Sequence, residues 1–387
     1  MKGKTNMGIH FDRERWKQIE KDYTLWWEGK LERPLIKAVV KSAYPPERKK
    51  PDVPVLSMKN CNCLEYSPEE IVDALDYELC QYEFLGDAFP LINMAAFGPG
   101  ALAGFCGAGL DNSTGTVWYF PVKQVPVEEL HVKYDPDNVW AKRIKDIYRA
   151  GKERWGSQVL MSMPDLGSVQ DVLATLLGNE EYMFALFDEP EEVLRVQNEI
   201  WNAFMDAYRD LEIVLGTDHP GYSDWSGLYS KERSYIFQDD FAYMISPEMF
   251  EEYALDDIKK LKKEFPNAMY HLDGVGNLKH LDMLLDNTDI QAYQWVYGAG
   301  QPSARHWMEV YDRLHERGKN MEIIGSVEDF SCIAEKNAKG LFYHLLIDDE
   351  EGTAKRNEAY KDCLSDYHIV EWSRRKETEE MIRRWKG

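Results

Sequence analysis

The amino-acid sequence predicts an α/β protein that folds as a single (β/α)8 TIM barrel with an N-terminal extension and a C-terminal helix. Two observations predict this fold. From residue 158 onward, short apolar runs rich in Val, Ile and aromatic residues alternate with longer amphipathic segments, and there are almost no hairpin signals between them. Repeated strand–helix units need right-handed crossovers and form a parallel sheet. An open doubly wound sheet is the alternative, and the number of strands favours the barrel.

Eight strands and six helical segments are predicted in chain order. The strands lie at residues 35–40, 90–97, 159–163, 213–216, 269–272, 290–296, 321–327 and 341–347. The helical segments lie at residues 169–187, 191–208, 247–265, 278–285, 303–317 and 332–339. Ser246 is a favourable N-cap, and it is followed by Pro247 at the first helical position and Glu248 in the first turn.

The chain is divided into an N-terminal extension at residues 1–66, packed on the barrel, and a barrel domain at residues 67–387. Residues 348–387 are charged and are expected to form a closing helix. Residues 89–110 carry no charge and are long enough to span a bilayer, but Pro99 and five glycines make them a poor membrane helix. We expect a buried strand and a glycine-rich loop there.

Composition excludes several classes of protein. With 44% hydrophobic residues the chain can form a real core, so intrinsic disorder is excluded as its main state. The formal net charge of −22 repels polyanions, so nucleic acid is not an expected partner. The polar N-terminus and six scattered cysteines predict a cytoplasmic protein with free thiols and no membrane partner. The cysteines are Cys61, Cys63, Cys80, Cys106, Cys332 and Cys363.

Catalytic residues of a parallel α/β barrel lie at the carboxyl ends of its strands, and these ends are rich in polar and aromatic residues here. His271 and Asp273 are two residues apart on a predicted strand, so both side chains face the mouth of the barrel. An imidazole and a carboxylate suit zinc or another divalent ion, or a histidine held in one tautomer by its acid. The alternative is a His–Asp pair that completes a buried polar layer.

Further candidates follow the other strands. Tryptophans paired with hydrogen-bonding groups are typical of a site for a planar or methylated ligand, although tryptophan also caps barrel cores. Asp239 and Asp240 precede the Ser246 cap and can reach the site as a carboxylate pair, with Asp239 a candidate catalytic residue. The predicted substrate-binding residues are Asp165, Tyr222, Asp224, Trp225, Gln294, Trp295 and His344.

The chain resembles the uroporphyrinogen decarboxylase superfamily over residues 67–347, and is closer to its corrinoid-dependent methyltransferases than to the decarboxylase. The motifs are Ile236-Phe237-Gln238-Asp239-Asp240, Ile245-Ser246-Pro247-Glu248-Met249-Phe250, Tyr270-His271-Leu272-Asp273-Gly274 and Ile324-Gly325-Ser326-Val327. The resemblance implies a (β/α)8 barrel. The arginine segment with which the decarboxylase binds its acidic tetrapyrrole is absent. Asp273 stands where thiol-activating methyltransferases have a zinc-binding Cys, and Tyr343-His344 replaces a further Cys.

The resemblance implies a methyltransferase that moves a methyl group between a small O- or N-methylated compound and a corrinoid (cobalamin) or tetrahydrofolate carrier. His271 and Asp273, with or without zinc, would then stabilise the leaving oxygen or nitrogen. The aromatic side chains Tyr222, Trp225 and Trp295 would clamp the substrate, and Asp224 or Asp239 would orient it. A corrinoid protein is the expected partner, and the chain is expected to be a monomer or homodimer.

Three alternatives remain open. One is a uroporphyrinogen decarboxylase-like decarboxylase, and another is a barrel that binds a small molecule without turnover. The third is a hydrolase of the glycosidase type, which works with two carboxylates placed across a sugar. Its candidate carboxylates are Asp165, Asp224, Asp239 and Glu328.

Overall fold

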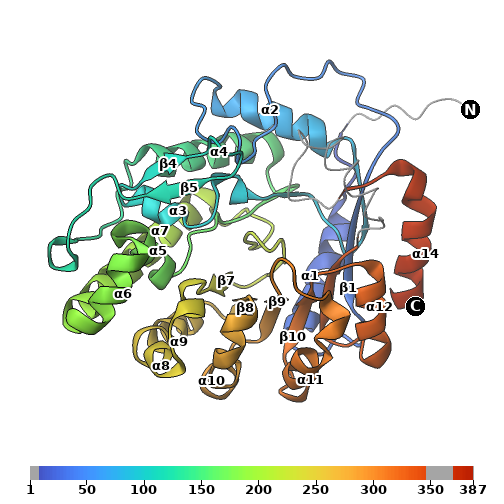
Figure 1. Cartoon of the computed structure of the whole chain (residues 1–387). Helices are drawn as coiled ribbons and strands as arrows, with labels where there is room; N and C mark the ends of the chain where they lie inside the picture. The colour runs from blue at the N-terminus through green and yellow to red at the C-terminus, as the bar shows by residue number, and fades with distance from the viewer. Residues whose placement is uncertain (1–7, 346–368, 387) are drawn as a thin grey trace, which may run out of the picture.

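The computed structural model describes residues 8–345 and 369–386, and it has a mixed α/β fold with strands inside and helices outside (Figure 1). The central sheet has eight strands. Its order is β12-β1-β11-β10-β9-β8-β7, and β2 pairs with β1 at the side. All neighbours in this order are parallel, whereas β2 is antiparallel to β1. The strands are β1 (Leu35–Lys41), β2 (Tyr82–Gly86), β7 (Ser234–Gln238), β8 (Asn267–Asp273), β9 (Ala292–Val296), β10 (Asn320–Ile323), β11 (Leu341–His344) and β12 (Ile369–Val370).

Two further strand pairs lie outside this sheet. The parallel pair is β3 (Leu91–Ile92) with β6 (Leu160–Met161), and the antiparallel pair is β4 (Gly109–Asp111) with β5 (Trp118–Phe120). Within the described residues, 8–345 and 369–386, no strand ladder joins the β3–β6 pair to the central sheet. No closed barrel is therefore detected in this part of the chain. Individual hydrogen bonds connect the segment after β6 to the residues around β7. Met163 N donates to Ser223 O at 2.9 Å, and Tyr235 Oη donates to Pro164 O at 3.0 Å.

Helices follow most of the strands and cover the outer face of the sheet (Figure 1). Their apolar faces supply much of the continuous core. The α-helices are α1 (Arg13–Trp27), α2 (Pro68–Leu79), α3 (Ala101–Phe105), α4 (Val139–Trp155), α5 (Val169–Leu177), α6 (Asn179–Asp188), α7 (Pro190–Leu215), α8 (Pro247–Tyr253), α9 (Leu255–Glu264), α10 (Leu281–Asn287), α11 (Met308–Glu316), α12 (Val327–Lys336) and α14 (Arg375–Lys386). Short 3-10 turns are η1 (Met94–Phe97), η2 (Val127–Glu129), η3 (Phe241–Met244), η4 (Val275–His280), η5 (Ala304–His306) and η6 (Trp372–Arg374).

One predicted strand is wrong. Residues 213–216 continue the amphipathic helix α7, which ends at Gly216 with a positive φ of 71°. Ile213 is on the solvent side of that helix and is 76% exposed, so a local apolar run there does not report a buried strand. The strand that the sequence analysis did not predict is β7, whose five residues are all buried.

Three other predictions differ in detail. The segment 169–187 is two helices that meet at Gly178, whose φ is 99°. The segment 247–265 is also two helices, which meet at Ala254. Residues 89–110 contain the short strand β3, the turn η1 and the helix α3. No helix in the described part of the chain is long and apolar enough to cross a membrane.

The N-terminal segment covers the amino ends of the sheet strands. Trp26 on α1 donates from Nε1 to Leu341 O at 3.1 Å, and Asn320 Nδ2 donates to Trp26 O at 2.6 Å. Because Leu341 and Asn320 begin β11 and β10, α1 lies at the end of the sheet opposite the candidate site. The strand β1 lies within the predicted N-terminal extension at residues 1–66, and it pairs with β11 and β12 of the central sheet.

The described residues include the C-terminal helix and most of the cysteines. The expected closing helix is present as α14, although residues 346–368 of the predicted closing segment lie outside the described part. No disulfide joins the described cysteines, which are Cys61, Cys63, Cys80, Cys106 and Cys332. The sixth, Cys363, also lies outside the described residues.

Candidate metal and active site

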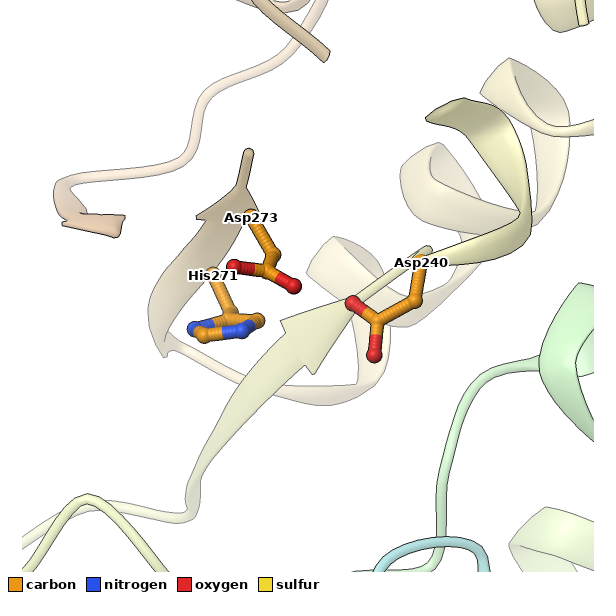
Figure 2. A group of neighbouring side chains, drawn as sticks. All are labelled: Asp240, His271 and Asp273. Atoms are coloured by element: carbon orange, nitrogen blue, oxygen red, sulfur yellow. The ribbon is translucent and has the colours of Figure 1, made fainter. Parts of the chain in front are cut away.

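Asp240, His271 and Asp273 converge at the carboxyl ends of β7 and β8 (Figure 2). Each offers one ligand atom, and these atoms lie within 4.8 Å of one another. Alternation along β8 places His271 and Asp273 on one face, as the sequence predicted. Gln238 is the β7 partner of His271 in the ladder, so the chain that continues past β7 brings Asp240 alongside. Together the three residues supply one imidazole nitrogen and two carboxylate oxygens.

The charge states of this group favour binding a cation. Asp240 is the exposed member of the group. Desolvation by the surrounding protein and the nearby carboxylates of Asp171 and Asp273 nevertheless raise its pKa to about 8. Burial lowers the pKa of His271, against the opposing effects of Gln294 and Asp273. A neutral imidazole keeps a lone pair for a metal or a proton, and a cation would relieve the repulsion among the carboxylates.

Gln294 connects this group to a buried acid. Its Oε1 lies 2.5 Å from His271 Nδ1, and its Nε2 donates to Glu322 Oε2 at 2.7 Å. The three residues are partners across the ladders of β8, β9 and β10. The sequence predicted Gln294 as a substrate contact, whereas both ends of its amide are engaged within the protein.

Lys37 and His344 lie on the far side of Glu322. His344 Nε2 is 3.6 Å from Glu322 Oε1 and 3.2 Å from Ser226 O. Lys37 Nζ donates to Gly227 O at 2.5 Å. Burial raises the pKa of Glu322 to about 8 and lowers that of Lys37 to about 7, while each charge favours the other. His344 is therefore part of a buried polar layer that extends from β1 to β8.

Trp225 packs directly on the candidate metal ligand. Its ring meets that of His271 edge to face, with centroids 5.1 Å apart. The indole Nε1 is buried without a hydrogen-bond partner in the described structure. The neighbouring Asp224 is buried and accepts from Ser226 N at 3.0 Å and Ser226 Oγ at 2.6 Å. Burial raises the pKa of Asp224 to about 6 despite these bonds.

Asp165 and Asp171 lie beside the same group. Asp165 is buried and accepts from Gly167 N at 2.9 Å, and burial raises its pKa to about 7. Asp171 at the start of α5 accepts from Phe241 N at 2.9 Å and Asp240 N at 3.2 Å. These two bonds hold the chain after β7 in the position that brings Asp240 to His271.

Three predicted residues are not among the candidate ligands of this group. Asp239 is buried and accepts from Ala242 N at 3.1 Å, and burial together with the carboxylates of Asp171 and Asp240 raises its pKa. Trp295 is fully buried and meets Trp307 edge to face at 5.5 Å. Alternation along β9 explains the placement of Trp295, which faces opposite to Gln294. Tyr222 forms an isolated bridge with Ser230. Their predicted roles in substrate binding and catalysis stay predictions.

Sequence reasoning did not single out Lys37, Asp171 or Glu322. Lys37 and Glu322 sit within apolar strands, and a charge inside such a run is the signal that could have found them. Asp171 had no such signal, because an acid in the first turn of a helix is ordinary. Asp240 was considered only as a neighbour of Asp239.

Comparison with known proteins supports the fold. No family model matches the chain, and no curated protein has a similar sequence. Among solved structures, a methyltransferase from Methanosarcina mazei is similar with a TM-score of 0.55. The match covers 88% of this chain and 99% of that one, at 12% sequence identity. At this identity the likeness shows a shared fold alone.

Proposed function

We propose that the protein is a methyltransferase that moves a methyl group between a small O- or N-methylated compound and a corrinoid or tetrahydrofolate carrier. The observation that carries this proposal is the donor set of Asp240, His271 and Asp273 at the strand ends. The fold is shared with a methyltransferase. The (β/α)8 barrel and membership of the uroporphyrinogen decarboxylase superfamily belong to the same proposal.

The donor set fits a catalytic zinc ion. Such sites use three protein ligands drawn from histidine, carboxylate and cysteine, and leave a fourth position open. Asp240, His271 and Asp273 supply three ligand atoms of this kind without a thiolate. When bound, the ion would supply a Lewis acid for the leaving oxygen or nitrogen.

Demethylation needs an acid because the bond to the methyl carbon breaks with its electron pair on oxygen or nitrogen. That atom must receive a proton or face a cation. In the metal-free protein, Asp240 with a pKa of about 8 is protonated at neutral pH and can donate to it. The Trp225 ring beside His271 offers an apolar surface for the organic part of the substrate.

The charge around the group indicates the class of substrate. The charges of Asp165 and Asp171 act on the candidate ligands, and no arginine is among the main influences on the pKa of Asp165, Asp171, Asp240 or His271 in the described part of the chain. A polycarboxylate such as a tetrapyrrole would be repelled, whereas a neutral or cationic compound would not. A small methyl ether or methylamine is therefore the proposed substrate, and a corrinoid protein the proposed partner of a cytoplasmic monomer or homodimer.

Zinc binding and methyl transfer test the proposal together. Titration calorimetry should show one zinc per chain, and cob(I)alamin or tetrahydrofolate should be methylated from a methyl ether or methylamine. His271→Ala and Asp273→Asn should lose both properties. His131→Ala is the control, because His131 is exposed and contacts Glu199 on α7. Failure of the wild-type protein to bind zinc or methylate either carrier would contradict the proposal and favour a hydrolase, a decarboxylase or a binding protein.

A further inference from the structure

Three adjacent strands present His271, Gln294 and Glu322 at one level of the sheet. His271 on β8 is the ladder partner of Gln294 on β9, which is in turn the partner of Glu322 on β10. Gln294 is 4% exposed and Glu322 is 2% exposed, so water does not compete for their bonds. The three side chains form a hydrogen-bonded line. Gln294 Nε2 lies 2.7 Å from Glu322 Oε2, and Gln294 Oε1 lies 2.5 Å from His271 Nδ1.

The donor and acceptor capacities along this line determine where the imidazole proton lies. The Gln294 amide turns its Nε2 donor toward Glu322 Oε2 at 2.7 Å and its Oε1 acceptor toward His271 Nδ1 at 2.5 Å. Its carbonyl oxygen then faces His271 and requires a donor at Nδ1. A neutral imidazole with a proton on Nδ1 has its lone pair on Nε2.

His344 and Lys37 lie beside Glu322 on the side away from Gln294. His344 Nε2 lies 3.6 Å from Glu322 Oε1, and burial raises the pKa of Glu322 while the hydrogen bond from Gln294 and the charge of Lys37 lower it. Lys37 is anchored by its bond to Gly227 O at 2.5 Å. Gln294 is thus held by its bond to Glu322 on β10, and Glu322 is in turn close to Lys37 on β1 and His344 on β11.

We infer that Gln294 and Glu322 are positioning residues that hold His271 in its Nδ1-protonated tautomer and leave Nε2 as the nitrogen that binds the metal. This inference rests on the proposed function for its metal, but the tautomer itself is a property of the metal-free protein. Metal-binding histidines commonly donate their second N–H to a carbonyl or carboxylate, and loss of that partner weakens metal binding about 10- to 100-fold.

The tautomer is measured directly by nitrogen NMR of the metal-free protein labelled at histidine. The chain has nine histidines, and His271→Asn identifies the signal that belongs to His271. We expect a single Nδ1–H form in the wild type. Gln294→Met removes the acceptor at Nδ1 at similar volume, so the Nε2–H form should become populated. Glu322→Gln can donate as well as accept, so both tautomers should be populated.

A matched control lies at the other end of the same strand. Gln291 precedes β9 and bonds to Pro266 O and Ala268 N, so Gln291→Met makes the same substitution away from His271. It should change neither the His271 signal nor zinc affinity, while Gln294→Met and Glu322→Gln should bind zinc about 10- to 100-fold more weakly. Circular dichroism confirms that each variant is folded.

The outcomes separate this inference from the proposed function. An Nε2–H form in the wild type, or an unchanged tautomer in both folded variants, overturns the positioning role. An unchanged zinc affinity in variants whose tautomer has shifted also overturns it, because the metal would then not depend on Nε2. A wild-type protein with the Nδ1–H form that binds no zinc contradicts the proposed function and leaves the tautomer assignment supported.

Discussion

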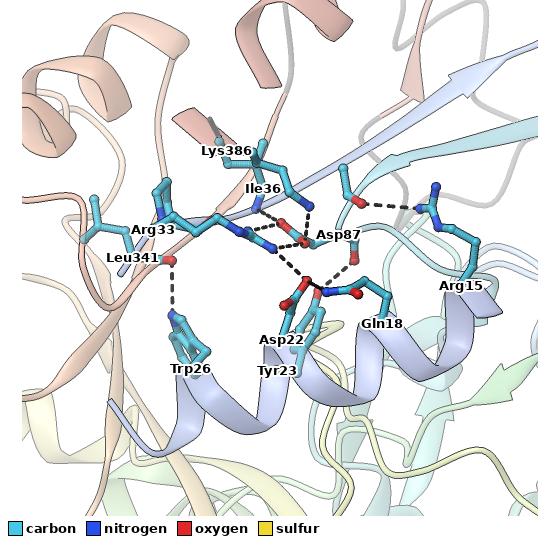
Figure 3. A network of polar contacts seen from close by, with 12 residues as sticks. Arg15, Gln18, Asp22, Tyr23, Trp26, Arg33, Ile36, Asp87, Leu341 and Lys386 are labelled. Atoms are coloured by element: carbon cyan, nitrogen blue, oxygen red, sulfur yellow. Dashed lines mark hydrogen bonds and ion pairs between the residues drawn. The ribbon is translucent and has the colours of Figure 1, made fainter. Parts of the chain in front are cut away.

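Asp87 joins three distant parts of the chain, and its removal should destabilise the protein strongly (Figure 3). Its carboxylate is 1% exposed and accepts from Ile36 N at 2.8 Å, Arg33 Nη1 at 2.9 Å and Arg33 Nη2 at 3.0 Å. It also accepts from Lys386 Nζ of α14 at 2.6 Å. Asp87→Ala leaves the Ile36 N–H buried without its acceptor and leaves Arg33 with Asp22 as its remaining carboxylate partner in the described structure.

Breaking a buried ion pair from one side costs about 3 to 5 kcal/mol, because the partner charge remains desolvated. We expect Asp87→Ala to lower the free energy of unfolding by this amount in equilibrium urea denaturation. Glu14→Ala is the control, since Glu14 pairs with Lys17 at 2.8 Å but is 79% exposed. That variant should change stability by less than about 0.5 kcal/mol. A loss below about 1 kcal/mol for Asp87→Ala would refute the reasoning that this network holds α1, β1 and α14 together.

Two further predictions concern protonation. The pKa of Asp165 is raised from 3.8 to about 7, so the folded protein binds an extra proton between these values and its stability falls as pH rises through that range. Asp165→Asn keeps an acceptor for Gly167 N and should remove this contribution to the pH dependence of stability, which is at most roughly 4 kcal/mol. The free energy of unfolding of both proteins, measured at pH 4 and at pH 8, checks this. An equal pH dependence in the two proteins would contradict the prediction. Burial raises the pKa of Cys61 and Cys106 to about 12, whereas Cys332 is exposed, so iodoacetamide at pH 8 should modify Cys332 first. Peptide mass spectrometry checks the order, and equally fast modification of Cys61 would show that its burial is wrong.

Local pattern was a good guide where a residue's role depends on its own strand. His271 and Asp273 share a face because alternation has a period of two, and this follows from sequence alone. The same rule places Gln294 and Trp295 on opposite faces, although both were predicted from the sequence as substrate-binding residues. Only the register of three strands showed that Gln294 lies between His271 and Glu322.

Local pattern failed where an element depends on distant partners. The run at 213–216 is apolar but belongs to the exposed end of α7, because a helix and a short buried strand have similar apolar content over four residues. The same limit applies to the third candidate ligand. Asp240 reaches His271 because Asp171, 69 residues earlier, holds its backbone N–H, and no local signal predicts such a contact.

The sequence by itself determined the class of the fold, its parallel strands and a His–Asp pair at a strand end, because these follow from periodicities of two and 3.6 residues. The tertiary structure decided which strands are neighbours, which acid completes the group with His271 and Asp273, and which residues control the imidazole. Those outcomes depend on ladder register and on bonds between residues far apart in the chain. Sequence periodicity describes the face of one element, whereas chemistry at a site depends on how several elements meet.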